Sequence, residues 1–143
     1  MIKAWATAAS DKPLEPFEYD PGPLGAEDVE IAVETCGVCH SDVSMMQNEW
    51  GMTAYPLVPG HEVIGRVTAL GANAKGLEIG QRVGVGWASS SCLHCQPCLN
   101  GDQNLCATHT GTIVGRHGGF AEKVRAQWPW AIPIPDGLDA KEA

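Results

Sequence analysis

The sequence predicts a mainly β domain, a barrel or sandwich of short strands with little helix. Two observations support this fold class. Short apolar runs follow one another along the chain, and 17 glycines and 10 prolines, among the residues that supply turn geometry, help to separate them. The length of 143 residues and the hydrophobic content of 44% suit a single domain, residues 1–143, that can bury a core.

The clearest strand is expected at Asp28–Thr35, where apolar Val29, Ile31 and Val33 alternate with other residues, as in a half-buried strand. A short helix is expected at about Asp42–Gln47, with Ser41 or Asp42 as its N-cap. Further strands are expected, in chain order, at Ile2–Ala6, Val63–Leu70, Arg82–Gly86, Phe120–Arg125 and Trp130–Ile134.

The last residues, Asp139–Ala143, look like the first turn of another helix. We therefore expect the sequence to continue into a longer protein.

Charge and composition exclude several kinds of partner. Nine Lys and Arg residues against 17 Asp and Glu residues give a formal charge of −8, which repels nucleic acid and anionic membrane surfaces. The N-terminal apolar run is too short for a signal peptide, and no stretch reaches the roughly 20 apolar residues that cross a bilayer. We expect a cytoplasmic protein, and in a reducing compartment its six cysteines are thiols or metal ligands.

Four of the cysteines form a cluster within a lobe at about 89–110. Cys92, Cys95 and Cys98 are separated by two-residue gaps, and Cys106 follows after seven more residues. Four thiolates complete a tetrahedral zinc shell with no open position, so the cluster predicts a structural zinc site. His94 lies inside it and is interpreted as a bystander.

Three other interpretations fit this cluster less well. The seven-residue gap and Ala107 differ from the spacing and the proline of a bacterial iron–sulfur site. A nucleic-acid-binding zinc ribbon needs basic surroundings, yet Asp102 is the only formal charge from Ser89 to Thr110. A redox dithiol is the third alternative.

Two further motifs contain a cysteine and a histidine. Each motif alone is weak evidence for a functional site. Cys39-His40-Ser41-Asp42 follows the clearest strand, and Gly60-His61-Glu62-Val63-Ile64-Gly65 follows about 20 residues later. With the four-cysteine cluster behind them, these motifs resemble the zinc-dependent medium-chain alcohol dehydrogenases. The stretches Asn48–Gly51, Tyr55–Val58 and Gly118–Glu122 are most similar to the cinnamyl alcohol dehydrogenase-like branch and its bacterial NADPH-preferring aldehyde reductases.

The resemblance implies a GroES-like, partly open β-barrel with short helices and a zinc-binding lobe. It also implies two ligands of a catalytic zinc, Cys39 and His61, with the third ligand, a cysteine, contributed from beyond Ala143. Glu62 is implied beside this zinc, in its open position when substrate is absent. By the same resemblance, Ser41 and His40 relay a proton, and His40 also contacts the cofactor.

Three further residues receive roles from their positions. Asp42 is expected to accept a hydrogen bond from His61 or to brace its loop. Trp50 and Trp87 are candidates for the wall of a pocket that takes aryl or long-chain aldehydes. The resemblance implies small aldehydes and alcohols as substrates.

The chain has no dinucleotide fingerprint. The nearest match, Gly84–Ser89, lacks the third glycine and leads into the cysteine cluster. We therefore expect the cofactor to be bound mainly by an absent Rossmann domain and the chain alone to be inactive. The resemblance implies NADP(H), more than NAD(H), as this cofactor, and a homodimer as the parent enzyme. The alternative function is a non-catalytic, zinc-stabilised GroES-like scaffold domain, in which Cys39, His61 and Glu62 have no common purpose.

Overall fold

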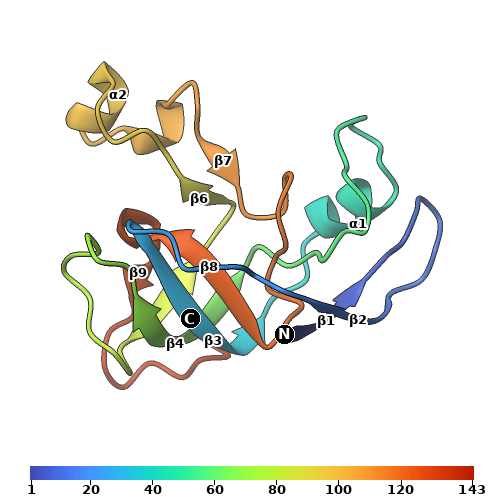
Figure 1. Cartoon of the computed structure of the whole chain (residues 1–143), viewed down its shortest axis with the longest axis horizontal. Helices are drawn as coiled ribbons and strands as arrows, with labels where there is room; N and C mark the ends of the chain where they lie inside the picture. The colour runs from blue at the N-terminus through green and yellow to red at the C-terminus, as the bar shows by residue number, and fades with distance from the viewer.

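The computed structural model describes all 143 residues and contains three antiparallel sheets. The largest has the strand order β8-β3-β4-β5-β9, and the others are the pairs β1-β2 and β6-β7 (Figure 1). None of these sheets closes on itself, so the domain is the mainly β, partly open structure that the sequence predicts. The strands are β1 Ile2–Ala6, β2 Glu15–Tyr19, β3 Asp28–Cys36, β4 Val63–Leu70, β5 Arg82–Val85, β6 Ala88–Ser90, β7 Thr110–Gly111, β8 Lys123–Gln127 and β9 Ile132–Pro133.

Helices are short and few. They are α1 His40–Met46, α2 Gln96–Leu99 and the 3₁₀ turns η1 Gln103–Leu105 and η2 Trp128–Trp130. No helix is long and apolar enough to cross a membrane.

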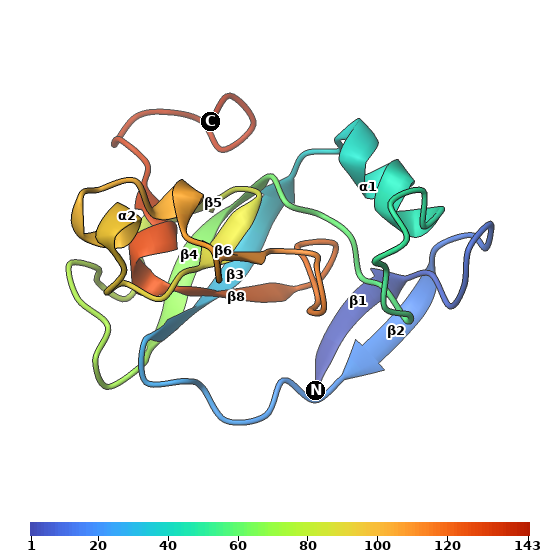
Figure 2. The same cartoon turned by 90° about the horizontal axis from the view of Figure 1, so that it is seen from above.

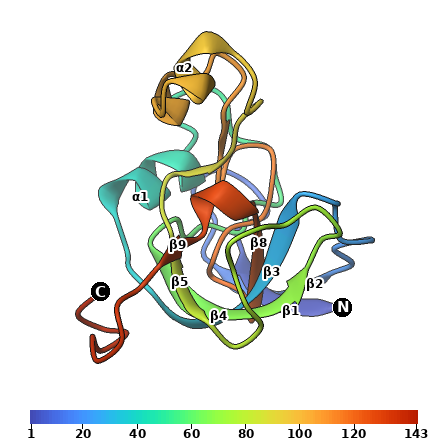
Figure 3. The same cartoon turned by 90° about the vertical axis from the view of Figure 1, so that its left-hand side faces the viewer.

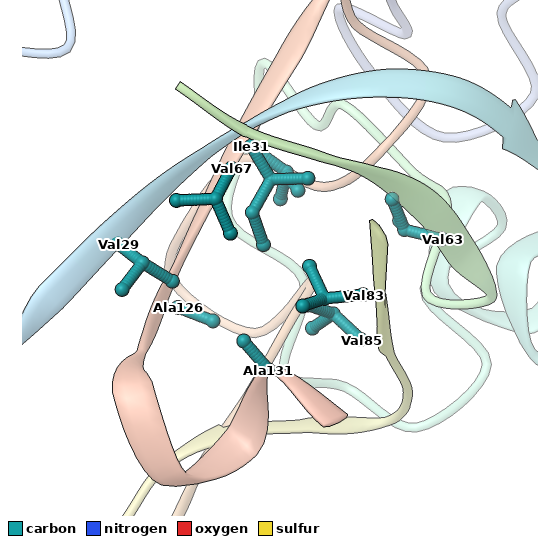
Figure 4. Close-up of a cluster of buried hydrophobic side chains, with 9 residues drawn as sticks. Val29, Ile31, Val63, Val67, Val83, Val85, Ala126 and Ala131 are labelled. Carbon is teal, nitrogen blue, oxygen red and sulfur yellow. The ribbon is translucent and has the colours of Figure 1, made fainter. Parts of the chain in front are cut away.

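The main core lies against the five-stranded sheet and consists of β-branched and small side chains. Alternate positions of β3 place Val29 and Ile31, both with 0% exposure, on the same buried side. Figure 4 shows them facing valines of β4 and β5. The whole cluster is Val29, Ile31, Val63, Val67, Val83, Val85, Val124, Ala126 and Ala131.

The segment between β6 and β7 forms a lobe that projects from the five-stranded sheet (Figures 1 and 3). The two short strands are its stem, and α2 and η1 lie between them along the chain. On the opposite side of the molecule, α1 lies beside the β1-β2 pair (Figure 2). Single bridges from Ala4 to Ala121 and from Thr7 to Leu57 connect that pair to the rest of the chain.

Several sequence expectations need correction. The helix begins at His40, two residues before the expected Asp42, and its N-cap is Cys39 instead of Ser41 or Asp42. The expected strand Phe120–Arg125 is displaced to β8, and only two residues of Trp130–Ile134 are strand because η2 precedes them. The first helical turn expected at Asp139–Ala143 is present as one isolated turn, closed by a 3.1 Å hydrogen bond from the Ala143 N–H to the Asp139 carbonyl.

An ion-pair cluster joins β3 to β8 on the sheet. Glu30, which is 9% exposed, accepts hydrogen bonds from Lys123 Nζ at 2.5 Å and from Arg125 Nη2 at 2.9 Å. Burial alone raises the pKa of this carboxyl, but the Lys123 and Arg125 hydrogen bonds outweigh it and hold the pKa below its ordinary value of 4.5.

A carboxyl whose pKa is lowered in the folded state stabilises the fold above its unfolded pKa, and this stabilisation disappears as the pH falls through the folded pKa. We therefore expect Glu30→Gln to lower the free energy of unfolding by about 1–2 kcal/mol at neutral pH. The difference from the parent should shrink as the pH falls below 4.5. Urea unfolding across this pH range measures it, with the exposed Glu18→Gln as control. A difference that did not change with pH would contradict the ion-pair explanation.

Candidate metal centres and the adjoining cavity

The four cysteines of the lobe converge on one point. The Sγ atoms of Cys92, Cys95, Cys98 and Cys106 all lie within 4.8 Å of one another, and those of Cys92 and Cys98 are 3.9 Å apart. A tetrahedral zinc with bonds of about 2.3 Å requires sulfur separations of about 3.8 Å. The cluster therefore fits a zinc ion, and His94 is not among its converging groups.

Backbone amides donate hydrogen bonds to two of these sulfurs, Cys92 Sγ and Cys106 Sγ. The Cys95 N–H donates to Cys92 Sγ at 3.3 Å, and the Cys92 N–H donates to Cys106 Sγ at 3.5 Å. The hydrogen bond from Cys92 is the main reason that the pKa of Cys106 is lowered to about 5. The lobe backbone thus favours the thiolate form at Cys106 and Cys92. At Cys95 the Cys98 backbone amide lowers the pKa, but burial and hydrogen bonds with the neighbouring thiols outweigh it and raise the pKa to about 12.

A second converging group is made by Cys39, His61 and Glu62, whose ligand atoms also lie within 4.8 Å of one another. Pairing of β3 with β4 produces this meeting, because Cys36 lies opposite Val63 at the ends of the two strands. The Gly37 N–H then donates to the Glu62 carbonyl at 2.9 Å and extends the pairing toward the group. One thiol, one imidazole and one carboxylate are ligands that zinc accepts.

The buried carboxylate of Asp42 holds the two halves of this group together. Its Oδ2 accepts the Cys39 N–H at 3.0 Å, while its Oδ1 accepts the Gly60 N–H at 2.8 Å and contacts His61 Nδ1 at 2.9 Å. Asp42 is 1% exposed. As Nδ1 is engaged by the carboxylate, the Nε2 atom of His61 is the one left to bind a metal.

Gly60 allows the chain to approach this closely. Its φ is +100°, and a Cβ built on it would lie 2.7 Å from the Phe120 backbone nitrogen and 2.9 Å from Cys36 Sγ. A side chain at this position would be strained and would collide with the backbone. Glycine is therefore required immediately before His61.

A cavity of about 840 Å³ opens beside the second group. His61, Glu62 and Trp87 line it, together with residues of β4, β5 and the C-terminal segment. The Trp87 ring meets the His61 ring edge to face, with centroids 5.1 Å apart. Trp50 does not line the cavity; it is 47% exposed and packs against Trp87 at a centroid distance of 5.9 Å.

Ser41 and His40 lie in the first turn of α1. Ser41 Oγ is 3.7 Å from Cys39 Sγ, so the hydroxyl is next to the candidate metal ligand. His40 is exposed, and no hydrogen bond joins it to Ser41. Consecutive helical residues face different directions. The relay that links these two residues therefore stays a prediction and needs a bridging group between them.

Two residues that the sequence pattern does not identify, Thr53 and Tyr55, fix the loop bearing Trp50. Thr53 Oγ1 donates to the Met45 carbonyl at 2.6 Å, and the Tyr55 hydroxyl donates to the Met46 carbonyl at 2.6 Å. These bonds satisfy carbonyls at the end of α1, which have no partner within the helix. Nothing in residue spacing identifies such contacts, because they depend on the path of the loop.

Comparison with known proteins agrees with this geometry. The sequence pattern described as Alcohol dehydrogenase GroES-like domain matches residues 25–136. The chain therefore belongs to this family.

An aldehyde reductase, AdhA, from Synechocystis sp. is 54% identical over 143 residues, which are all of this chain and 43% of that protein. A cinnamyl alcohol dehydrogenase structure from Sorghum bicolor superposes with a TM-score of 0.89 at 32% identity, over 97% of this chain and 42% of that one. A Helicobacter pylori structure, described as CAD complexed with NADP(H), gives 0.91 at 27% identity, over 98% and 43%.

These findings confirm the resemblance to zinc-dependent alcohol dehydrogenases and aldehyde reductases and to their cinnamyl branch. The chain spans less than half of the length of the curated relatives that it matches: 43% of the Synechocystis reductase and 41% of a cinnamyl alcohol dehydrogenase from Arabidopsis thaliana.

The role of Asp42 in holding Cys39, Gly60 and His61 together can be tested by replacing one carboxylate oxygen with an amide NH₂. Asp42→Asn keeps the size but turns an amide NH₂ toward at least one N–H donor, so we expect a loss of about 2–4 kcal/mol in the free energy of unfolding. Urea unfolding measures it. Asp11→Asn is a matched control, since Asp11 is exposed and its φ of 62° suits asparagine. Equal free energies of unfolding for the two variants would contradict this role of Asp42.

Proposed function

We propose that this chain is the substrate- and zinc-binding domain of a zinc-dependent alcohol dehydrogenase or aldehyde reductase, which interconverts aldehydes and primary alcohols by hydride transfer. One observation carries the proposal: Cys39, His61 and Glu62 converge beside a cavity, in a chain that also has a separate four-thiolate cluster. A non-catalytic scaffold domain needs the four-thiolate cluster but not the group of Cys39, His61 and Glu62.

In this proposal the two metal sites have different tasks. Cys92, Cys95, Cys98 and Cys106 fill the shell of a structural zinc and leave no position for substrate. Cys39 and His61 supply two ligands of a catalytic zinc. The third ligand, a cysteine, comes from a part of the enzyme outside residues 1–143. Glu62 takes the open position when substrate is absent.

Zinc supplies Lewis-acid polarisation of the substrate oxygen, and NADP(H) supplies or accepts the hydride. The residues of this chain orient the metal site and the substrate. Asp42 fixes the ring of His61 and the turn at Cys39, as its 2.9 and 3.0 Å contacts support. Trp87 restricts the position of the imidazole from the cavity side.

Proton movement is assigned to Ser41 and His40. The Ser41 hydroxyl exchanges a proton with the substrate oxygen, which its distance of 3.7 Å from Cys39 Sγ supports. His40 is exposed and can exchange that proton with solvent. A cofactor bound beside the site would also contact His40.

The substrate class follows from the walls of the cavity. Trp87 lines the cavity, and Trp50 packs against Trp87 without lining the cavity itself. Flat or long apolar aldehydes are therefore favoured. NADP(H) is proposed above NAD(H), which the NADP(H) complex of the Helicobacter pylori relative supports. A homodimer and a cytoplasmic location complete the proposal; the six unpaired cysteines suit a reducing compartment.

The two sites predict different zinc retention. We expect the chain, dialysed against a mild chelator, to keep one zinc, because only the lobe offers a complete shell. Cys106→Ser should lose it, whereas Cys36→Ser should keep it, since Cys36 belongs to neither converging group. Metal analysis by mass spectrometry measures the ratio. Two tightly held zincs per chain would contradict the missing third ligand.

The enzymatic proposal is tested by a chimera in which this chain replaces the matching 43% of the Synechocystis reductase. We expect no oxidation of NADPH with benzaldehyde or cinnamaldehyde by the chain alone, and turnover by the chimera. Ser41→Ala in the chimera should lower kcat by about 10²-fold or more. Cys39→Ser should abolish turnover, and Glu18→Gln, on the exposed strand β2, should not change it.

A folded, zinc-loaded chimera without turnover of any aldehyde or alcohol would sink the enzymatic proposal and favour the scaffold domain. The intact reductase, measured in parallel, shows that the assay works.

A further inference from the structure

A second cavity, of about 430 Å³, lies between the β1-β2 pair and β8. Tyr19 at the end of β2, the loop residues Arg116 and His117, and Arg125 of β8 contribute to its lining. It shares no residue with the cavity that contains His61 and Glu62. Its volume lies in the range of small-molecule sites.

Arg116 is the only arginine of the chain without an ion-pair partner. Arg66 and Arg82 are paired with Glu34, and Arg125 is paired with Glu30. Arg116 instead donates to two neutral groups, Ser89 Oγ at 2.9 Å and the Arg125 carbonyl at 2.5 Å. Burial lowers the pKa of Arg116, although Asp28 opposes this from a distance beyond an ion pair. A guanidinium remains charged, and a partly buried charge is costly without a counter-charge.

His117 also lines this cavity. Its Nδ1 is the only buried side-chain nitrogen or oxygen of the protein without a hydrogen-bond partner. The ring packs against both Phe17 and Tyr19, with centroid distances of 5.7 and 4.3 Å. Burial lowers the pKa of His117, so the free ring is neutral near pH 7. The ring therefore forms an uncharged part of the cavity wall beside Arg116 and Tyr19.

The other polar groups of the cavity show what it selects. The Tyr19 hydroxyl has no hydrogen-bond partner in the protein, and burial raises its pKa, so it remains a donor. Arg125 uses its guanidinium on Glu30 and on the carbonyls of residues 21–23. Asp20 is the one carboxylate at the rim, and its Oδ1 accepts the Gly22 N–H at 2.8 Å.

We propose that this cavity is a binding site for a small oxyanion, a carboxylate or a phosphate, held by the guanidinium of Arg116 together with His117 and Tyr19. The ligand provides the counter-charge that Arg116 lacks and accepts a hydrogen bond from the Tyr19 hydroxyl, while the His117 ring forms part of the wall against it. The planar guanidinium matches the two oxygens of either group. Because the site shares no residue with the proposed active site, it does not depend on the enzymatic proposal.

Titration of the zinc-loaded protein tests the site. Sodium acetate and inorganic phosphate are added in separate series at constant ionic strength, with chloride as the balancing salt, and the imidazole resonances of His117 and His61 are followed by NMR. We expect saturable shifts at His117 in the millimolar range with at least one of the two anions, and none at His61. The stronger anion identifies carboxylate or phosphate. Shifts that fail to saturate with either, or that follow chloride equally, overturn the proposal.

Three variants separate binding from bulk charge. Tyr19→Phe keeps the ring against His117 but removes the hydroxyl, and Arg116→Lys keeps the charge but removes the planar fork. We expect each to weaken binding about tenfold or more, by the loss of a charge-assisted hydrogen bond. Arg66→Gln removes a cation outside the cavity and should bind like the parent. Unchanged affinity in both Tyr19→Phe and Arg116→Lys would overturn the assignment.

Discussion

The buried carboxylate of Asp42 is the interaction on which the rest of the site depends. It accepts hydrogen bonds from Cys39 and Gly60 and contacts His61, groups that belong to two separate turns. Asp42 is 1% exposed, so its carboxylate would strongly destabilise the folded protein if these donors were absent. The fold therefore requires all three contacts. The geometry of Cys39 relative to His61 is therefore set by one side chain that need not touch a metal.

The register of β3 against β4 brings these turns within reach of Asp42. Cys36 pairs with Val63, and irregularities in the ladder lie between Glu30 and Ile31 and between Val33 and Thr35. A shift by one residue would turn Val29 and Ile31 out of the core and would move Cys39 away from His61. Core packing and site assembly are thus consequences of the same strand pairing, and neither can change without the other.

The sequence predicts the fold best where a short apolar run is bounded by turn residues. Ile2–Ala6 and Val63–Leu70 are such runs and are found with their expected bounds. It fails for β2, in which Pro16 and two glutamates hide the strand, and for β6 and β7, which are too short to show any period. The start of α1 is displaced because Asp42, an apparent N-cap, instead sits at the third helical position and bonds back to Cys39.

The two converging groups differ in how far sequence can predict them, and the difference is physical. The lobe cysteines lie within 15 residues, from 92 to 106, so their spacing alone fixes their approach, and backbone amides of the same segment complete the site. The group at Cys39 and His61 depends on strand register, on Gly60 and on Trp87, which meet only in three dimensions. Spacing and family resemblance can name its candidate ligands. Only the folded chain shows that Trp87 borders the cavity while Trp50 stands behind it.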